Sequence, residues 1–250
     1  MANTEPHATA RALVADRHPE ARAAFLAGSV LTSWRTPYSD LDIVVVTDSA
    51  AAPYRESLRS GGWPVELFVQ SPESWREFFT REVAERRSPL MDMCAQGDLI
   101  LDRDGVGAAL AEESRRVAAA GPAPLTEEER DAHRYYLTDL LDDLAGCRDP
   151  GERLFVVAEI VQRTAAFLLL QHRAWLGGGK WLARRADEVR PGFAARLEAA
   201  SRAAPAAGCG DLVALVDEVL APAGGRLWEG YVVGRRTPEP APPGDGPGAS

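Results

Sequence analysis

The feature of this sequence that most constrains its fold is the run Leu41-Asp42-Ile43-Val44-Val45-Val46. The run is rich in β-branched residues, which favour a β-strand. It is also almost continuously apolar. A strand with one face in water alternates apolar and polar residues, whereas a strand covered on both faces does not. The run therefore predicts a central strand in a sheet that is covered on both sides.

Other parts of the first half predict a mixed set of strands and helices. Short apolar runs predict strands at 24–27 and 65–69, with an edge strand at 98–103. Ser71 followed by Pro72 is typical of a helix N-terminus, with an N-cap and a proline at the first helical position. Helices are expected at 8–24 (interrupted by Pro19), from Ser71 to about Arg87, and at 105–119.

The pattern changes after Gly121-Pro122-Ala123-Pro124, which marks a break in the chain. Thr126 and Glu129 then form the pattern of a capping box. Only helical periodicity follows, at 126–146, 150–175, 179–188, 192–203 and 210–221. We therefore predict an α+β protein with an α/β domain at 1–120, an all-α helical bundle domain at 125–236, and a disordered Pro/Gly-rich tail at 237–250.

Composition and charge exclude several classes of protein. The net charge of −9 disfavours a nucleic-acid partner, because such proteins usually carry a basic face. Three scattered cysteines form neither a disulfide framework nor a zinc site. No membrane partner is expected, because charged and polar residues interrupt the longest apolar stretch, near Val156. Without a visible signal peptide, the expected location is the cytoplasm.

Three acidic residues are the candidates for a metal site. Side chains two positions apart in a strand point to the same face, so Asp40 and Asp42 project together at the start of the central strand. Glu66 lies within the strand expected at 65–69 and would reach the same face if the two strands are neighbours. Adjacent carboxylates repel one another unless a cation neutralises them. Mg²⁺ prefers oxygen ligands, so this trio predicts a magnesium site.

Gly28 and Ser29 form a small-residue turn after the strand at 24–27. Such a turn presents backbone N–H groups and a hydroxyl, which suit a phosphate. A phosphate-binding turn combined with paired metal-binding carboxylates is typical of phosphoryl and nucleotidyl transfer.

This arrangement, Gly28-Ser29 followed by Asp40-Leu41-Asp42 and a later acid in a strand, resembles the DNA polymerase β-like nucleotidyltransferase superfamily. With its helical second half, the chain is similar to the aminoglycoside (antibiotic) nucleotidyltransferases. The resemblance implies an Mg²⁺-dependent enzyme that moves a nucleoside monophosphate, AMP from ATP, onto a hydroxyl of a small molecule such as an aminoglycoside and releases pyrophosphate. It also implies that Asp40 and Asp42 bind Mg²⁺, that Ser29 contacts the triphosphate, and that Glu66 is either the general base or a third metal ligand.

Two basic residues are further candidates for binding the nucleotide. Lys180 is the only lysine beside 27 arginines, and it follows Gly177-Gly178-Gly179 at an expected helix start. Trp181 stands where a P-loop needs Ser or Thr, so the segment is not a P-loop. In enzymes that the chain resembles, a lysine of the helical domain reaches the nucleotide phosphates, which is the role expected of Lys180; the alternative is an ordinary helix start. Arg35, between Ser29 and Asp40, is a weaker phosphate candidate.

Candidates for binding the acceptor are Asp139, Asp143 and Trp181. The two acids could meet a cationic acceptor or could form a solvated helix face, and the tryptophan could equally belong to the core. Two other functions stay open. The chain could modify a protein or a tRNA, as nucleotidyltransferases of the toxin–antitoxin type do, or it could be a non-catalytic nucleotide-binding sensor.

Overall fold

The structure is a computed structural model that describes residues 5–204 and 209–234. Its one five-stranded sheet has the order β3-β4-β2-β1-β5. β2 and β4 are parallel neighbours, and every other pair in the sheet is antiparallel. The strands are β1 (Ala23–Ala27), β2 (Leu41–Val46), β3 (Tyr54–Ser60), β4 (Trp63–Gln70) and β5 (Asp98–Asp102).

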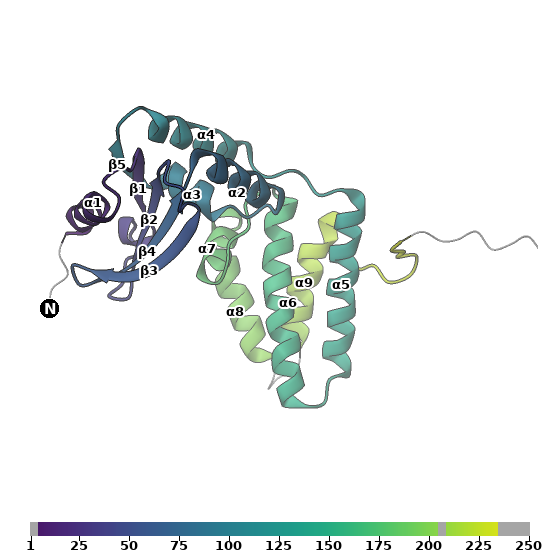
Figure 1. Ribbon diagram of the computed structural model, residues 1–250. Helices are drawn as coiled ribbons and strands as arrows, with labels where there is room; N and C mark the ends of the chain where they lie inside the picture. Colours follow the sequence, from purple (N-terminus) through teal and green to yellow (C-terminus); the bar gives the residue numbers. More distant parts are fainter. Residues whose placement is uncertain (1–4, 205–208, 235–250) are drawn as a thin grey trace, which may run out of the picture.

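Helices cover both faces of the sheet, as the apolar run of β2 predicted (Figure 1). Ile43 and Val45 belong to the apolar cluster beneath α1 (Pro6–Arg17). Val44 and Val46 point to the opposite face because strand side chains alternate. There they pack with residues of the remaining helices of this half, which are α2 (Pro72–Ala84), α3 (Pro89–Gln96) and α4 (Val106–Ala120).

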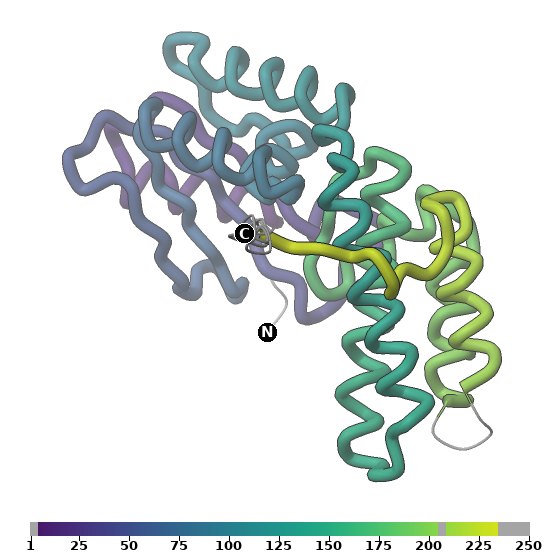
Figure 2. Tube along the Cα trace, turned by 90° about the vertical axis from the view of Figure 1, so that its right-hand side faces the viewer, coloured from purple at the N-terminus to yellow at the C-terminus, as the bar shows by residue number. Residues whose placement is uncertain are grey.

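The second half of the chain is helical and extends away from the sheet (Figure 2). Its helices share one buried apolar cluster, and they are α5 (Glu127–Gly146), α6 (Pro150–Gln171), α7 (Lys180–Val189), α8 (Phe193–Ala203) and α9 (Gly210–Leu220). The two short 3₁₀ helices are η1 (Ser29–Leu31) and η2 (Ala221–Ala223). The α+β class is confirmed. The exact domain boundaries stay a prediction, and the tail predicted at 237–250 lies outside the described residues.

By length and composition, one helix of the described residues could cross a membrane. This is α6, and the prediction that no segment is long and apolar enough is therefore wrong. Ile160, Phe167 and Leu168 of this helix lie in the core of the helical half. Packing within the protein thus accounts for part of the apolar character of α6, whereas Leu154 and Phe155 of the same helix are exposed.

Several element boundaries differ from the prediction. The strand β3 was not predicted, because its residues alternate between half-buried and exposed and include few apolar side chains. The helix expected to continue to Arg87 ends at Ala84. The backbone then turns at Arg86, which has a left-handed φ of 57°. At both predicted helix starts the structure has capping boxes, formed by Ser71 with Ser74 and by Thr126 with Glu129.

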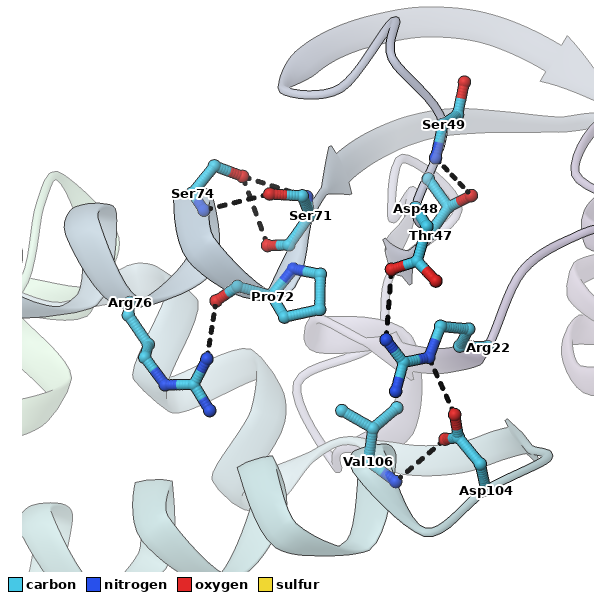
Figure 3. A network of polar contacts seen from close by, with 10 residues as sticks. All are labelled: Arg22, Thr47, Asp48, Ser49, Ser71, Pro72, Ser74, Arg76, Asp104 and Val106. Atoms are coloured by element: carbon cyan, nitrogen blue, oxygen red, sulfur yellow. Dashed lines mark hydrogen bonds and ion pairs between the residues drawn. The ribbon is translucent and has the colours of Figure 1, made fainter.

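A polar network fixes the end of the sheet that is remote from Gly28 (Figure 3). The guanidinium of Arg22, just before β1, donates to Asp48 after β2 at 3.0 Å and to Asp104 after β5 at 2.7 Å. Asp104 also accepts a bond from the N–H of Val106 at 3.2 Å. One cation therefore links the segments that precede β1 and follow β2 and β5.

Candidate active site

The structure brings the three predicted carboxylates together. Asp42 of β2 is the register partner of Glu66 in the parallel strand β4, so both side chains project from the same face. Asp40 lies just before β2. One carboxylate oxygen of each residue lies within 4.8 Å of the others, and all three residues are half-buried. The strand pairing that sequence reasoning could only assume is thus what creates the cluster.

The electrostatics of this cluster favour a bound cation. The pKa of Asp42 is raised to about 6, chiefly by burial and also by the neighbouring charges of Asp40 and Glu66. Arg55 and Lys180 oppose the shift but do not cancel it. A hard divalent ion would relieve both the repulsion and the cost of burial. The donor set, three carboxylates with converging oxygens, therefore fits Mg²⁺.

The turn at Gly28-Ser29 lies against the cluster. Gly28 has a φ of 95°, and a Cβ at this position would clash with Oδ2 of Asp42. Only glycine allows the backbone to approach the carboxylate so closely. Ser29 is buried, and its hydroxyl shares a hydrogen bond of 2.9 Å with the hydroxyl of Ser39. Ser39 immediately precedes Asp40, so this bond closes the loop that carries the first metal candidate.

A cavity of about 900 Å³ opens beside these residues. The sheet half supplies Gly28, Ser29, Asp40 and Asp42 to its wall, and the helical half supplies Lys180 at the start of α7. The positive charge of Lys180 lowers the pKa of Asp42, so the ammonium group of Lys180 interacts electrostatically with this carboxylate. The lone lysine is therefore part of this site, whatever its role.

Of the other predicted site residues, only some line the cavity. Trp181 lines the cavity beside Lys180. Arg35 instead lies over the ring of Trp63, 4.8 Å from the ring centroid, and is not among the residues of the cavity wall. Asp139 and Asp143 lie on α5 and are also not part of the wall.

Two arginines that the sequence did not single out belong to this region. Arg55 of β3 forms an ion pair with Glu66 and lies 4.8 Å over the ring of Phe68. Its position depends on the β3–β4 register, and β3 carries no strong strand signal. Arg87 lines the cavity. No sequence signal could have found it, because its direction depends on the backbone turn at Arg86.

Taken together, the cavity combines an oxygen-rich cation site, a glycine–serine turn and a lysine. Asp40, Asp42 and Glu66 would hold the metal, which when bound supplies Lewis acidity toward a phosphate oxygen. Ser29 and Lys180 line the same cavity and contribute a hydroxyl and an ammonium group to it. This set of groups suits the transfer of a phosphorus-centred group to a nucleophile.

No protein-family profile matches the sequence, and no curated protein matches it. Among solved structures, the chain is similar to a nucleotidyltransferase-like protein from Exiguobacterium sibiricum 255-15. The two are 13% identical with a TM-score of 0.43, and the match covers 88% of this chain and 77% of that chain. The residues and the geometry of the site are therefore the evidence for function.

Proposed function

We propose that the protein is an Mg²⁺-dependent nucleotidyltransferase that transfers AMP from ATP to a hydroxyl of a small molecule. The observation that carries this proposal is the convergence of Asp40, Asp42 and Glu66 beside the Gly28-Ser29 turn. Asp40 and Asp42 of this cluster lie at the wall of a cavity of about 900 Å³. The cavity is large enough for a nucleotide. The same residues carry the sequence resemblance to polymerase β-like nucleotidyltransferases.

Each residue has a definite role in the proposed reaction. Ser29 and Lys180 bind the phosphates, and Asp40 and Asp42 hold the metal. The acceptor hydroxyl attacks the α-phosphorus in line, the bond to the bridging oxygen breaks, and pyrophosphate leaves. Glu66 either accepts the hydroxyl proton or serves as a third metal ligand, in which case the proton passes to water. Its ion pair with Arg55 fixes the carboxylate opposite Asp42 in either role.

The acceptor class follows from the sequence resemblance and from the residues that line the cavity. An aminoglycoside-like antibiotic is suggested by the sequence resemblance alone, because Asp139 and Asp143 do not belong to the cavity wall. Trp181 does, and it offers an aromatic face to an acceptor. No specific observation on the described residues favours a macromolecular acceptor or a non-catalytic sensor.

The test incubates the protein with Mg²⁺, each nucleoside triphosphate in turn, and a panel of aminoglycosides, lincosamides, tRNA and cell lysate. Mass spectrometry reads the gain of a nucleoside monophosphate, and a coupled assay reads pyrophosphate. Asp42→Ala should lower turnover by at least about 100-fold, the usual scale for loss of electrostatic stabilisation. Asp16→Ala, an exposed site on α1, is the matched control. If no acceptor gains mass and pyrophosphate release is the same in Asp42→Ala, the proposed function is wrong.

A further inference from the structure

Arg86 and Arg87, which are neighbours between α2 and α3, have side chains that contact different parts of the molecule. The guanidinium of Arg86 forms two hydrogen bonds with the carboxylate of Glu129 on α5, at 2.7 and 2.8 Å. It also donates to the carbonyls of Ala123 and Pro124. The hydrogen bonds that Glu129 accepts from Arg86 and from the backbone N–H of Thr126 lower the pKa of its carboxyl to about 2. The backbone carbonyl of Arg86 accepts a bond from the N–H of Leu176 at 2.8 Å.

This anchoring holds Arg86 in its unusual backbone conformation. A left-handed conformation costs a non-glycine residue of order 1–3 kcal/mol, and it persists only where the surroundings enforce it. The bonds of Arg86 to Glu129 and Leu176 supply that enforcement. The turn places the next residue, Arg87, at the wall of the active-site cavity.

Arg87 packs against the glycine loop that precedes Lys180. A Cβ added to Gly178 would lie 2.5 Å from Nη2 of Arg87 and 3.0 Å from its Cζ. The guanidinium therefore occupies the space that a side chain at position 178 would need. Gly178 and Lys180 are two residues apart, so the loop that Arg87 contacts also leads into Lys180, and both cations line the cavity.

The guanidinium of Arg87 has no hydrogen bond or ion pair with any residue in 5–204 or 209–234. Arg185, which also lines the cavity, differs because it pairs with Asp92. A cation at a cavity wall without a protein anion is available to an anionic ligand. Guanidinium groups bind phosphate oxygens through two parallel hydrogen bonds, so phosphate is the ligand chemistry that suits Arg87.

We propose that Arg87 binds the terminal phosphates of the nucleotide and the pyrophosphate that remains after transfer, together with Lys180. This inference rests on the proposed function. It assigns Arg87 as a substrate-binding residue and gives Gly178 a reason to lack a side chain. Arg86, whose contact with Glu129 joins the two halves of the chain, is thus the sequence neighbour of a residue that binds phosphate.

The test is calorimetric titration of inorganic pyrophosphate and of AMP into the full chain with Mg²⁺. Arg87→Ala should weaken pyrophosphate binding by about 10- to 100-fold, the scale of a lost charge-assisted hydrogen bond. Gly178→Ala should act in the same direction, because the new Cβ displaces the guanidinium. The double variant should bind no more weakly than Arg87→Ala, since both changes remove one interaction. AMP, which lacks the terminal phosphates, should bind each variant within about 2-fold of the unmutated chain.

Two control variants match these changes. Arg81→Ala removes an exposed arginine from α2 that packs on Phe78. Gly146→Ala adds a methyl group where no atom lies within 4 Å. Both controls should bind pyrophosphate as the unmutated chain does. If Arg87→Ala also stays within about 2-fold, or if the losses in the double variant add, the proposal is wrong.

The outcome is separable from that of the proposed function. Pyrophosphate binding that depends on Arg87, without nucleotide transfer to any acceptor, would support the phosphate site and contradict the enzyme. Transfer that is lost in Asp42→Ala, with pyrophosphate binding unchanged in Arg87→Ala, would support the enzyme and overturn the phosphate site.

Discussion

The charge on Asp42 should destabilise the metal-free protein, and Asp42→Asn should remove that cost. The carboxylate is half-buried beside Asp40 and Glu66, and its pKa rises from 3.8 to about 6 on folding. None of the described residues donates a hydrogen bond to Asp42 that the amide would disrupt. The variant keeps the shape of the side chain and loses the charge, so it isolates the electrostatic cost.

The magnitude follows from the pKa difference of about 2 between the folded and unfolded chain. Each pKa unit corresponds to about 1.4 kcal/mol, so ionised Asp42 costs at most about 3 kcal/mol at neutral pH. The sign follows from the raised pKa, because the folded chain holds the proton more tightly. The cost is absent below about pH 4, grows between about pH 4 and 6, and is constant above that range.

Urea unfolding in EDTA at pH 4 and pH 7.5 measures this effect. Asp42→Asn should be more stable than the unmutated chain by up to about 3 kcal/mol at pH 7.5, and the two should converge at pH 4. Asp16→Asn, an exposed carboxylate on α1, should show no such gain. Adding Mg²⁺ should reverse the order, since the ion stabilises the intact cluster by binding the folded state. A variant that is equally or less stable at pH 7.5 in EDTA would refute the reasoning.

Three further results are expected. Gly28→Ala should cost of order 1–3 kcal/mol more than Gly105→Ala in urea unfolding, because both have positive φ but only Gly28 would clash with Asp42; equal losses would contradict a steric contact. Lys180→Ala should raise the KM for the nucleotide at least about 10-fold, as steady-state kinetics would show, whereas an unchanged KM would make it only a helix start. Phe167→Ala should destabilise the helical half by about 3–5 kcal/mol in thermal unfolding, since its ring is fully buried; a loss below about 1 kcal/mol would contradict that packing.

Much of the fold could be predicted from local sequence. The apolar run of β2 predicted a strand with two covered faces, and the structure has apolar clusters on both. The Thr126 capping box predicted the start of α5 to the residue. These signals depend only on neighbouring residues, so they can be read without knowing which distant elements pack against the segment. The edge strand β3 and the turn at Arg86 were missed because their conformations depend on contacts with β4 and Glu129.

Local sequence likewise predicts the position of some residues of the candidate site and not of others. Asp40 and Asp42 share a face because of strand periodicity, which the sequence alone determines. Glu66 joins them only through the parallel register of β2 with β4. Lys180 and Arg87 reach the cavity only because two halves of the chain close around it. Arg35, which the sequence places between Ser29 and Asp40, instead packs on Trp63.

The sequence by itself determined the kinds of groups available, the strand that carries two carboxylates and the glycine–serine turn. Tertiary structure decided which cations face those carboxylates and which acids stay outside the cavity. The physical reason is that periodicity fixes the direction of a side chain over a few residues. Interactions between residues more than a hundred positions apart, such as Asp42 and Lys180, depend on how whole helices and strands pack.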